Sequence, residues 1–168
     1  KIISAKKEGK QVVVVVSAMG SSTDELIALA NELSETPSPR EMDMLLSAGE
    51  RITMSLLAMH LNSLGYDSYS LTGSQAGIIT TSRHGRAEIE KISGERVKEG
   101  LEKGSIVIVA GFQGFNPDTR EITTLGRGGS DATAVALAAS NEADNFFNCA
   151  FASDTTSVFS TSALGAPK

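Results

Sequence analysis

Cysteine and histidine are scarce in this chain of 168 residues, which has one cysteine, Cys149, and two histidines. A single cysteine excludes an internal disulfide and a cysteine-rich metal centre. His60 and His84 have no metal-ligand spacing to each other or to Cys149, so we interpret them as structural or surface groups. We therefore expect no protein metal site, and we interpret Cys149 as a small core residue rather than a nucleophile.

Basic charge and long apolar runs are also limited. Fifteen Lys and Arg residues stand against twenty Asp and Glu residues, giving a formal net charge of −5. Because binding to a phosphate backbone needs a basic surface, this balance argues against nucleic acid as a partner. No apolar run approaches the length of a membrane span and no signal peptide is recognisable, so we expect no membrane partner and a cytoplasmic location.

The sequence does contain apolar strand-like runs that alternate with helical patterns. Five consecutive valines, Val12 to Val16, are typical of a strand that is buried on both faces. Residues 40–64 form the longest helical pattern, and their apolar side chains cover most of the circumference, which predicts a buried helix. The alternation predicts an α/β fold, a three-layer αβα sandwich with a mainly parallel sheet. With no repeat or long linker, residues 1–168 are expected to form a single domain.

The other expected elements follow from shorter patterns. We expect strands at 11–16, 66–71, 77–81, 105–110 and 121–125, and helices at 26–33, 97–103 and 130–141. Residues 1–7 are typical of the end of a helix, and residues 146–159 are β-like but rich in Ser and Thr. Ligands in such folds bind at the carboxyl ends of strands, where the glycine loops should gather.

The segment Leu125 to Asp131 is the most informative part of the chain. Its double glycine, at 128–129, lets the backbone approach a ligand closely. Ser130 suits a helix N-cap, where free N–H groups attract anions. Arg127 offers a planar fork to a carboxylate or phosphate, and Asp131 is favoured in a first helical turn. Together these groups predict a binding site for an anionic substrate.

Two features have both a functional and a structural interpretation. Gly111 and Gly114 follow a buried strand, where they either cradle phosphates with their amides or simply make a tight turn. Glu50 lies inside the longest apolar helix, where a carboxylate needs a partner. That partner is either a base such as Arg51 or the ammonium group of a substrate. The neighbouring Gly49 favours the substrate, because a glycine inside a helix can mark a close approach.

Five segments, taken in order, resemble aspartate kinase, the amino acid kinase that phosphorylates the β-carboxylate of aspartate with ATP. They are residues 16–26, 41–51, 72–77, 111–114 and 124–131, and the resemblance covers roughly residues 1–144. Residues 73–77 are similar to the bacterial form, in which regulatory domains follow the kinase domain. No regulatory domain is expected within this chain.

The resemblance implies a role for each motif residue. Glu50 would bind the α-ammonium group of aspartate and Arg127 its carboxylate, while Thr23 and Ser130 would add hydroxyl contacts. Asp131 would be catalytic, because it would organise the lysine that assists phosphoryl transfer. The implied nucleotide-binding residues are Ser17, Gly20, Gly111, Gly114, Gly128, Gly129 and Asp154. From the residues alone, the more common role of Ser17 and Thr23 in this loop would be to cap a helix.

The resemblance also implies the reactants and partners. ATP with Mg²⁺ would be the phosphoryl donor, and L-aspartate the acceptor in the first step of lysine, threonine and methionine biosynthesis. The enzyme would be a homo-oligomer, or a hetero-oligomer with regulatory chains.

The sequence departs from the family pattern in two places. No Lys-x-Gly-Gly-Ser strand precedes Val12, so we expect the chain to begin downstream of its catalytic lysine and to have little activity alone. Residues 153–159 are similar in pattern to the segment that holds the nucleotide but lack its second Asp and its Gly, so Asp154 is the one residue whose role is carried over. These departures favour one alternative, a non-catalytic protein with a role in assembly or amino-acid binding. The other alternative, a kinase for a different acidic amino acid, is disfavoured by the Ser47–Arg51 segment.

Overall fold

The computed structural model describes the backbone of residues 1–140, 145–151 and 154–161, and the side chains of residues 1–140. The helices are α1 (Ile2–Lys7), α2 (Ser22–Leu33), α3 (Pro39–Ser63), α4 (Glu95–Glu102) and α5 (Gly129–Ser140). The strands are β1 (Gln11–Val16), β2 (Ser68–Leu71), β3 (Ile78–Thr80), β4 (Ile89–Ile92), β5 (Ile106–Ala110), β6 (Gln113–Asn116), β7 (Glu121–Thr124), β8 (Asn145–Phe151) and β9 (Asp154–Thr161).

The larger sheet has five strands in the order β2-β5-β1-β9-β8. β2, β5 and β1 are parallel neighbours, with Val14 opposite Ile108 in the central pair. β9 runs antiparallel to β1, and β8 runs antiparallel to β9. Two reversals restore the direction, so four of the five strands point the same way and the expected mainly parallel sheet is confirmed.

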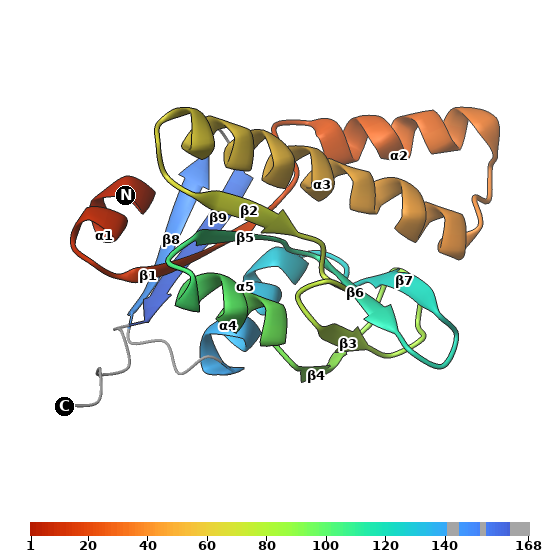
Figure 1. The fold of residues 1–168 in the computed structure, drawn as a ribbon. Coiled ribbons are helices and arrows are strands. Elements are labelled where there is room, and N and C mark those ends of the chain that lie inside the picture. Colours follow the sequence, from red (N-terminus) through yellow and green to blue (C-terminus); the bar gives the residue numbers. More distant parts are fainter. Residues whose placement is uncertain (141–144, 152–153, 162–168) are drawn as a thin grey trace.

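Helices cover both faces of this sheet (Figure 1). On one face, Val12, Val14 and Val16 pack with Ile2 of α1 and with Met54, Ala58 and Leu61 of α3. On the other face, Val13 and Val15 pack with residues of α4 and α5, including Val97 and Leu137. The alternation of strand side chains therefore makes the valine run the middle of both apolar layers. The expected three-layer sandwich is confirmed.

A smaller sheet was not expected from the sequence. It has four strands in the order β4-β3-β6-β7, and β4 has no counterpart among the predicted elements. The expected break at 111–114 is only partly a loop, because Gln113 and Gly114 already belong to β6. This second sheet lies beside the N-terminal half of α3, as Figure 1 shows. This arrangement places β7 against α3.

The prediction that residues 40–64 form a buried helix is wrong, although the helix itself is present. Ile52, Leu56 and Met59 are 55%, 48% and 66% exposed, whereas Asp43 and Glu50 are buried. The reason is that α3 packs on the sheet with one face only, which carries Met54, Ala58 and Leu61, so that apolar residues on its outer face stay exposed. An apolar pattern around the whole circumference did not reveal which side is covered.

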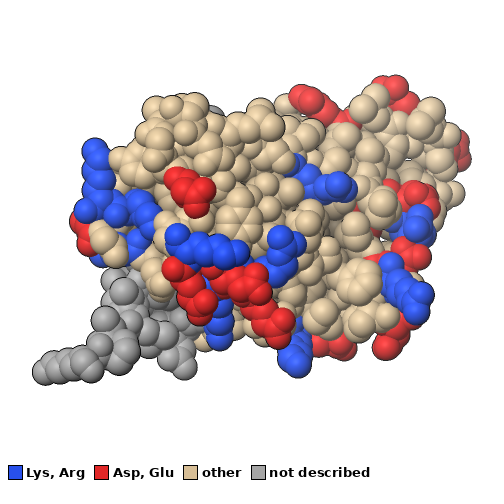
Figure 2. Space-filling model, in the orientation of Figure 1, with Lys and Arg blue, Asp and Glu red and all other residues tan. Residues whose placement is uncertain are grey.

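Other boundaries differ by a few residues. α2 begins at Ser22, four residues before the expected start, so Thr23 lies in its first turn. Residue 141, expected at the end of the last helix, lies outside the described residues. Within the described part, no helix has the length and apolarity needed to cross a bilayer. Figure 2 shows charged side chains gathered over α4, while the surface over α3 is mostly uncharged.

We predict that Gly100→Ala destabilises the protein. A Cβ atom at Gly100 would collide with the ring of Tyr69 and lie 2.7 Å from Val107 Cγ2. The ring has little freedom to move, because Tyr69 Oη donates to the Arg96 carbonyl at 2.6 Å. Partial burial also raises the pKa of this phenol, so it stays a donor at neutral pH. Overpacking of this kind costs about 1–3 kcal/mol, which outweighs the roughly 1 kcal/mol helix preference of alanine over glycine.

Chemical denaturation would measure the difference in the free energy of unfolding. The matched control is Glu99→Ala, an exposed change in the same helix that should stay within about 0.5 kcal/mol. A stabilised Gly100→Ala protein would contradict the close packing of α4 on β2 and β5.

Candidate functional site

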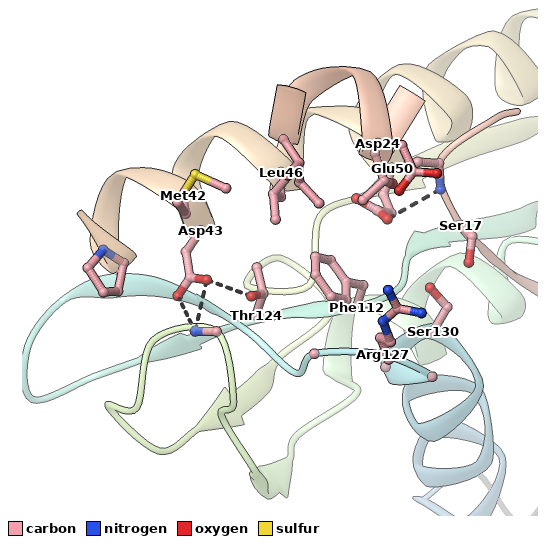
Figure 3. A pocket seen from close by; sticks show the side chains of 18 of the residues that line it. Ser17, Asp24, Met42, Asp43, Leu46, Glu50, Phe112, Thr124, Arg127 and Ser130 are labelled. Carbon is pink, nitrogen blue, oxygen red and sulfur yellow. Dashed lines mark hydrogen bonds between the residues drawn. The ribbon is translucent and has the colours of Figure 1, made fainter. Parts of the chain in front are cut away.

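A pocket of about 770 Å³ lies where β1 and β5 end, between α3 and the first turns of α2 and α5. Residues from several distant segments meet there, as Figure 3 shows. The lining residues are Ser17, Ala18, Thr23, Asp24, Ile27, Pro37, Pro39, Met42, Asp43, Leu46, Glu50, Gly85, Phe112, Thr124, Gly126, Arg127, Gly128, Gly129, Ser130 and Asp131.

Most of the predicted site residues line this one pocket. They are Ser17, Thr23, Glu50, Arg127, Gly128, Gly129, Ser130 and Asp131. Gly20, Gly111 and Gly114 are not part of the lining. Asp154 begins β9 and Cys149 lies in β8, but their side chains are outside the described part of the chain.

Glu50 is a buried carboxylate that projects into the pocket from α3. It is 4% exposed, and its Oε1 accepts a hydrogen bond from the Ala18 amide at 3.3 Å. Gly49 makes this contact possible, because a Cβ atom there would lie only 2.7 Å from Ala18 Cβ. The close approach that Gly49 marks is therefore that of the loop after β1. Arg51 is exposed, so the two neighbouring side chains point to different sides of the helix.

The loop before α5 supplies the opposite wall of the pocket. Gly126 and Gly128 have φ angles of +78° and +76°, which glycine adopts without strain. This path carries the exposed Arg127 to the pocket side, across from Glu50 (Figure 3). α5 begins at Gly129, so Ser130 lies inside the first turn and the prediction that it is the N-cap is wrong. The first turn of α5, whose amides have no partner within the helix, still lines the pocket.

Gly111 and Gly114 both serve close packing. A Cβ atom at Gly111 would lie 2.8 Å from Ser130 Cβ, so glycine is needed where β5 meets the start of α5. Gly114 lies in β6, where a Cβ atom would collide with Thr80 and approach the Ile78 carbonyl oxygen to 3.0 Å. Packing alone explains both glycines. Their phosphate contacts remain a prediction.

Phe112 has a strained backbone at the pocket wall. Its φ of +67° is unusual for a residue other than glycine and costs of order 1–3 kcal/mol. Its amide donates to Thr133 Oγ1 at 3.2 Å, and its carbonyl accepts from the Leu125 amide at 2.9 Å. These bonds to α5 and to the end of β7 hold the conformation and leave the ring on the pocket side. Sequence patterns gave no signal for this residue.

Asp43 is a second buried carboxylate on α3, and we assigned it no role from the sequence. It is 1% exposed and accepts hydrogen bonds from Thr124 Oγ1 at 2.5 Å, the Gly85 amide at 3.0 Å and His84 Nδ1 at 2.7 Å. The signal that could have found it is its place in the helix, seven residues before Glu50 and on the same face. His84, interpreted as a structural or surface group, is half-buried through this contact.

The pocket carries both charge signs on a mostly apolar frame. Glu50 and Asp43 come from the α3 wall of the pocket, and Arg127 comes from the wall formed by the loop before α5. Thr23 and Ser130 add hydroxyl groups to the lining. Such an arrangement suits a small zwitterion that offers an ammonium group to one wall and a carboxylate to the other. Among the described residues, no three His, Cys, Asp or Glu side chains gather in a way that could hold a metal ion.

The sequence is similar to known kinases over nearly its whole length. Residues 1–163 match the model of the amino acid kinase family. The chain is 56% identical over 159 residues to the aspartokinase of Corynebacterium glutamicum, covering 95% of this chain and 37% of that protein. It is 58% identical to aspartokinase 2 of Bacillus subtilis, covering 95% and 38%. The chain thus spans little more than a third of the curated relatives it matches.

Solved structures of aspartate kinases are also similar to this chain. Aspartate kinase from Synechocystis superposes with a TM-score of 0.70 at 45% identity, over 85% of this chain and 23% of that one. E. coli aspartokinase III, solved in complex with aspartate and ADP, superposes with a TM-score of 0.60 at 29% identity, over 71% and 27%.

We predict opposite outcomes for the two neighbours of Glu50. Gly49→Ala should lower the free energy of unfolding by about 1–3 kcal/mol, because its Cβ atom would force α3 away from Ala18. Arg51→Ala should change it by less than about 0.5 kcal/mol, because Arg51 is exposed. Urea titrations of both variants give the comparison. A loss of several kcal/mol in Arg51→Ala would instead support the salt-bridge interpretation of Glu50, since it would strand a buried charge.

Proposed function

We propose, from the premise that this chain belongs to the amino acid kinase family, that it forms much of the kinase domain of an aspartate kinase. The reaction transfers the γ-phosphoryl group of ATP to the β-carboxylate of L-aspartate. The observation that carries the proposal is that buried Glu50 and the cationic Arg127 line opposite walls of one pocket. The similarity to aspartokinases of C. glutamicum and B. subtilis supports it.

The two charged walls match the ends of an amino acid. Glu50 accepts hydrogen bonds from the α-ammonium group, and its burial strengthens that contact because little water competes. Arg127 binds a carboxylate with two parallel hydrogen bonds. Thr23 and Ser130, from the first turns of α2 and α5, add hydroxyl groups between the charged walls. A ligand fixed at both ends presents its remaining carboxylate in one direction only.

The proposed chemistry needs positioning and charge neutralisation more than it needs a base. The acceptor carboxylate is already ionised at neutral pH, so no proton has to be removed before it attacks the γ-phosphorus. The anionic reactants repel each other, and the amides of Gly128 and Ser130 at the start of α5 offset part of that repulsion. The Gly129 amide already donates to the Gly126 carbonyl at 3.0 Å. Asp131, in the same turn, is the proposed partner of the lysine that neutralises the transferred group.

ATP would bring Mg²⁺ into the site. This ion is usually held by substrate phosphates, water and one or two carboxylates, and Asp24 is a carboxylate in the pocket lining that could contact it. When bound it would neutralise phosphate charge. Ser17, the Gly20 turn and residues 111–114 remain the proposed nucleotide contacts. A larger oligomer with regulatory chains, and the place of the reaction in amino-acid biosynthesis, are part of the same proposal.

We predict that Glu50→Gln, made in the full-length protein, raises the KM for aspartate much more than the KM for ATP. The loss of a charge-assisted hydrogen bond costs about 1.5–3 kcal/mol, which is roughly 10- to 150-fold in affinity. Saturation curves for each substrate, measured as ADP formation, separate the two constants. Equal effects on both substrates, or a loss of thermal stability alone, would favour a structural role for Glu50. Glutamate in place of aspartate tests the alternative substrate.

We predict that Arg127→Lys and Asp131→Asn impair turnover in different ways. Arg127→Lys should weaken aspartate binding, because an ammonium group cannot reproduce a two-pronged contact with a carboxylate. Asp131→Asn should leave that binding nearly intact and lower the maximal rate by on the order of 10²- to 10³-fold. Calorimetric titration with aspartate, beside initial rates at saturating substrate, distinguishes them. A near-normal maximal rate in Asp131→Asn would reduce its role to the helix dipole, worth only about 0.3–1 kcal/mol.

A further inference from the structure

Asp43 joins three segments that meet beside the pocket. Its Oδ1 accepts from Thr124 Oγ1 and from the Gly85 amide, and its Oδ2 accepts from His84 Nδ1 and, at 3.2 Å, from the same amide. Three donors therefore share the two oxygens, because the Gly85 amide contacts both, and each oxygen has at least one donor to itself. Although Asp43 lines the pocket, it is committed to the protein rather than to a ligand.

The three segments are those that carry or support the charged walls. Asp43 lies two helical turns before Glu50 on the inner face of α3. Thr124 ends β7 and is followed, two residues later, by the Gly126–Arg127 loop. Gly85 touches that loop directly, because a Cβ atom at Gly126 would lie 3.1 Å from the Gly85 carbonyl oxygen. One carboxylate thus fixes the helix that carries Glu50 to the strand that leads to Arg127.

Further contacts make this junction rigid. The Ala87 amide donates to the Thr124 carbonyl at 2.9 Å, so the segment around Gly85 is tied to β7 through its backbone as well. The exposed pair Arg40–Glu121 joins α3 to the start of β7 at 2.9 Å. Exposed ion pairs contribute little, so the buried contacts of Asp43 dominate the junction.

We propose that Asp43 is a positioning residue that sets the separation of the ammonium-binding and carboxylate-binding walls through its bond to Thr124. This inference rests on the proposed function, since that function assigns Glu50 and Arg127 to the two ends of aspartate. The separation matters because two fixed charges bind a zwitterion well only at one spacing. Loosening the junction therefore weakens aspartate binding while the phosphate-binding turn of α5 is preserved.

Two adjacent threonines on β7 provide a matched test. Thr124 is 1% exposed and bonds to Asp43, whereas Thr123 is fully buried and bonds to Thr80 Oγ1 at 2.6 Å. Neighbouring residues of a strand face opposite sides, so Thr123 has no part in the junction. Valine at either position removes one buried hydroxyl with little change of shape. Both changes should cost similar stability, yet only Thr124→Val should disturb the pocket.

The experiment compares the two variants in the full-length protein by calorimetric titration with L-aspartate and by initial rates. We expect Thr124→Val to weaken aspartate binding and raise its KM about tenfold. The KM for ATP should change less than about twofold, and Thr124→Ser should restore aspartate binding. We expect Thr123→Val to leave both constants within about twofold of the parent. If Thr124→Val does not fold, Thr124→Ala and Thr123→Ala give the same comparison.

A double-mutant cycle identifies the partner of Thr124. If its hydroxyl acts through Asp43, combining Thr124→Val with Asp43→Ala should weaken aspartate binding no more than Asp43→Ala alone. If the double variant instead loses affinity for aspartate by the product of the two single losses, Thr124 acts independently of Asp43 and contacts the substrate itself, which would overturn the inference. Equal effects of Thr123→Val and Thr124→Val on aspartate binding would also overturn it. If the parent protein binds no L-aspartate, the proposed function fails first, and the titration shows this before any variant is compared.

Discussion

A carboxylate can be buried only where fixed donors replace its water, and α3 buries two of them. Asp43 and Glu50 are 1% and 4% exposed on the inner side of one helix. Their donors come from outside that helix: the Ala18 amide for Glu50, and Thr124, His84 and Gly85 for Asp43. Unsatisfied, such groups would cost several kcal/mol each. The loop after β1, the turn between β3 and β4 and the end of β7 therefore supply the donors that allow this helix to bury two carboxylates.

The two halves of α3 are held in place by different kinds of contact. Its C-terminal half packs Met54, Ala58 and Leu61 on the central sheet, which supplies apolar burial. Its N-terminal half is held by directed bonds, including one from Gln113 Nε2 to the Ser47 carbonyl at 3.1 Å. Apolar contacts tolerate small shifts, whereas hydrogen bonds to a carboxylate fix distance and angle. The binding wall thus sits on the half of the helix whose position is defined most narrowly.

The sequence was sufficient for the layers and for eight of the twenty residues that line the pocket. Val12 to Val16 predicted the central strand because its side chains are apolar on both faces, and the Gly126–Asp131 segment predicted one wall of the pocket. The smaller sheet was missed because its strands are short and partly polar; β4, for example, is only Ile89–Ile92. Asp43 was given no role because its donors, from Gly85 to Thr124, lie far away in the sequence. The close packing of Gly111 against Ser130 was not predicted, because only the fold brings these two residues together.

Phe112 shows where stability and pocket shape compete. Its backbone sits at a φ of +67°, a conformation that glycine adopts freely and phenylalanine does not. Glycine at this position would relax the chain, yet it would also remove the ring that closes the pocket between the β5 end and the Arg127 loop. Substitutions chosen only to raise thermal stability tend to select such relaxed positions. For this fold, an engineered variant with a higher melting temperature can therefore be obtained at the expense of a defined binding wall.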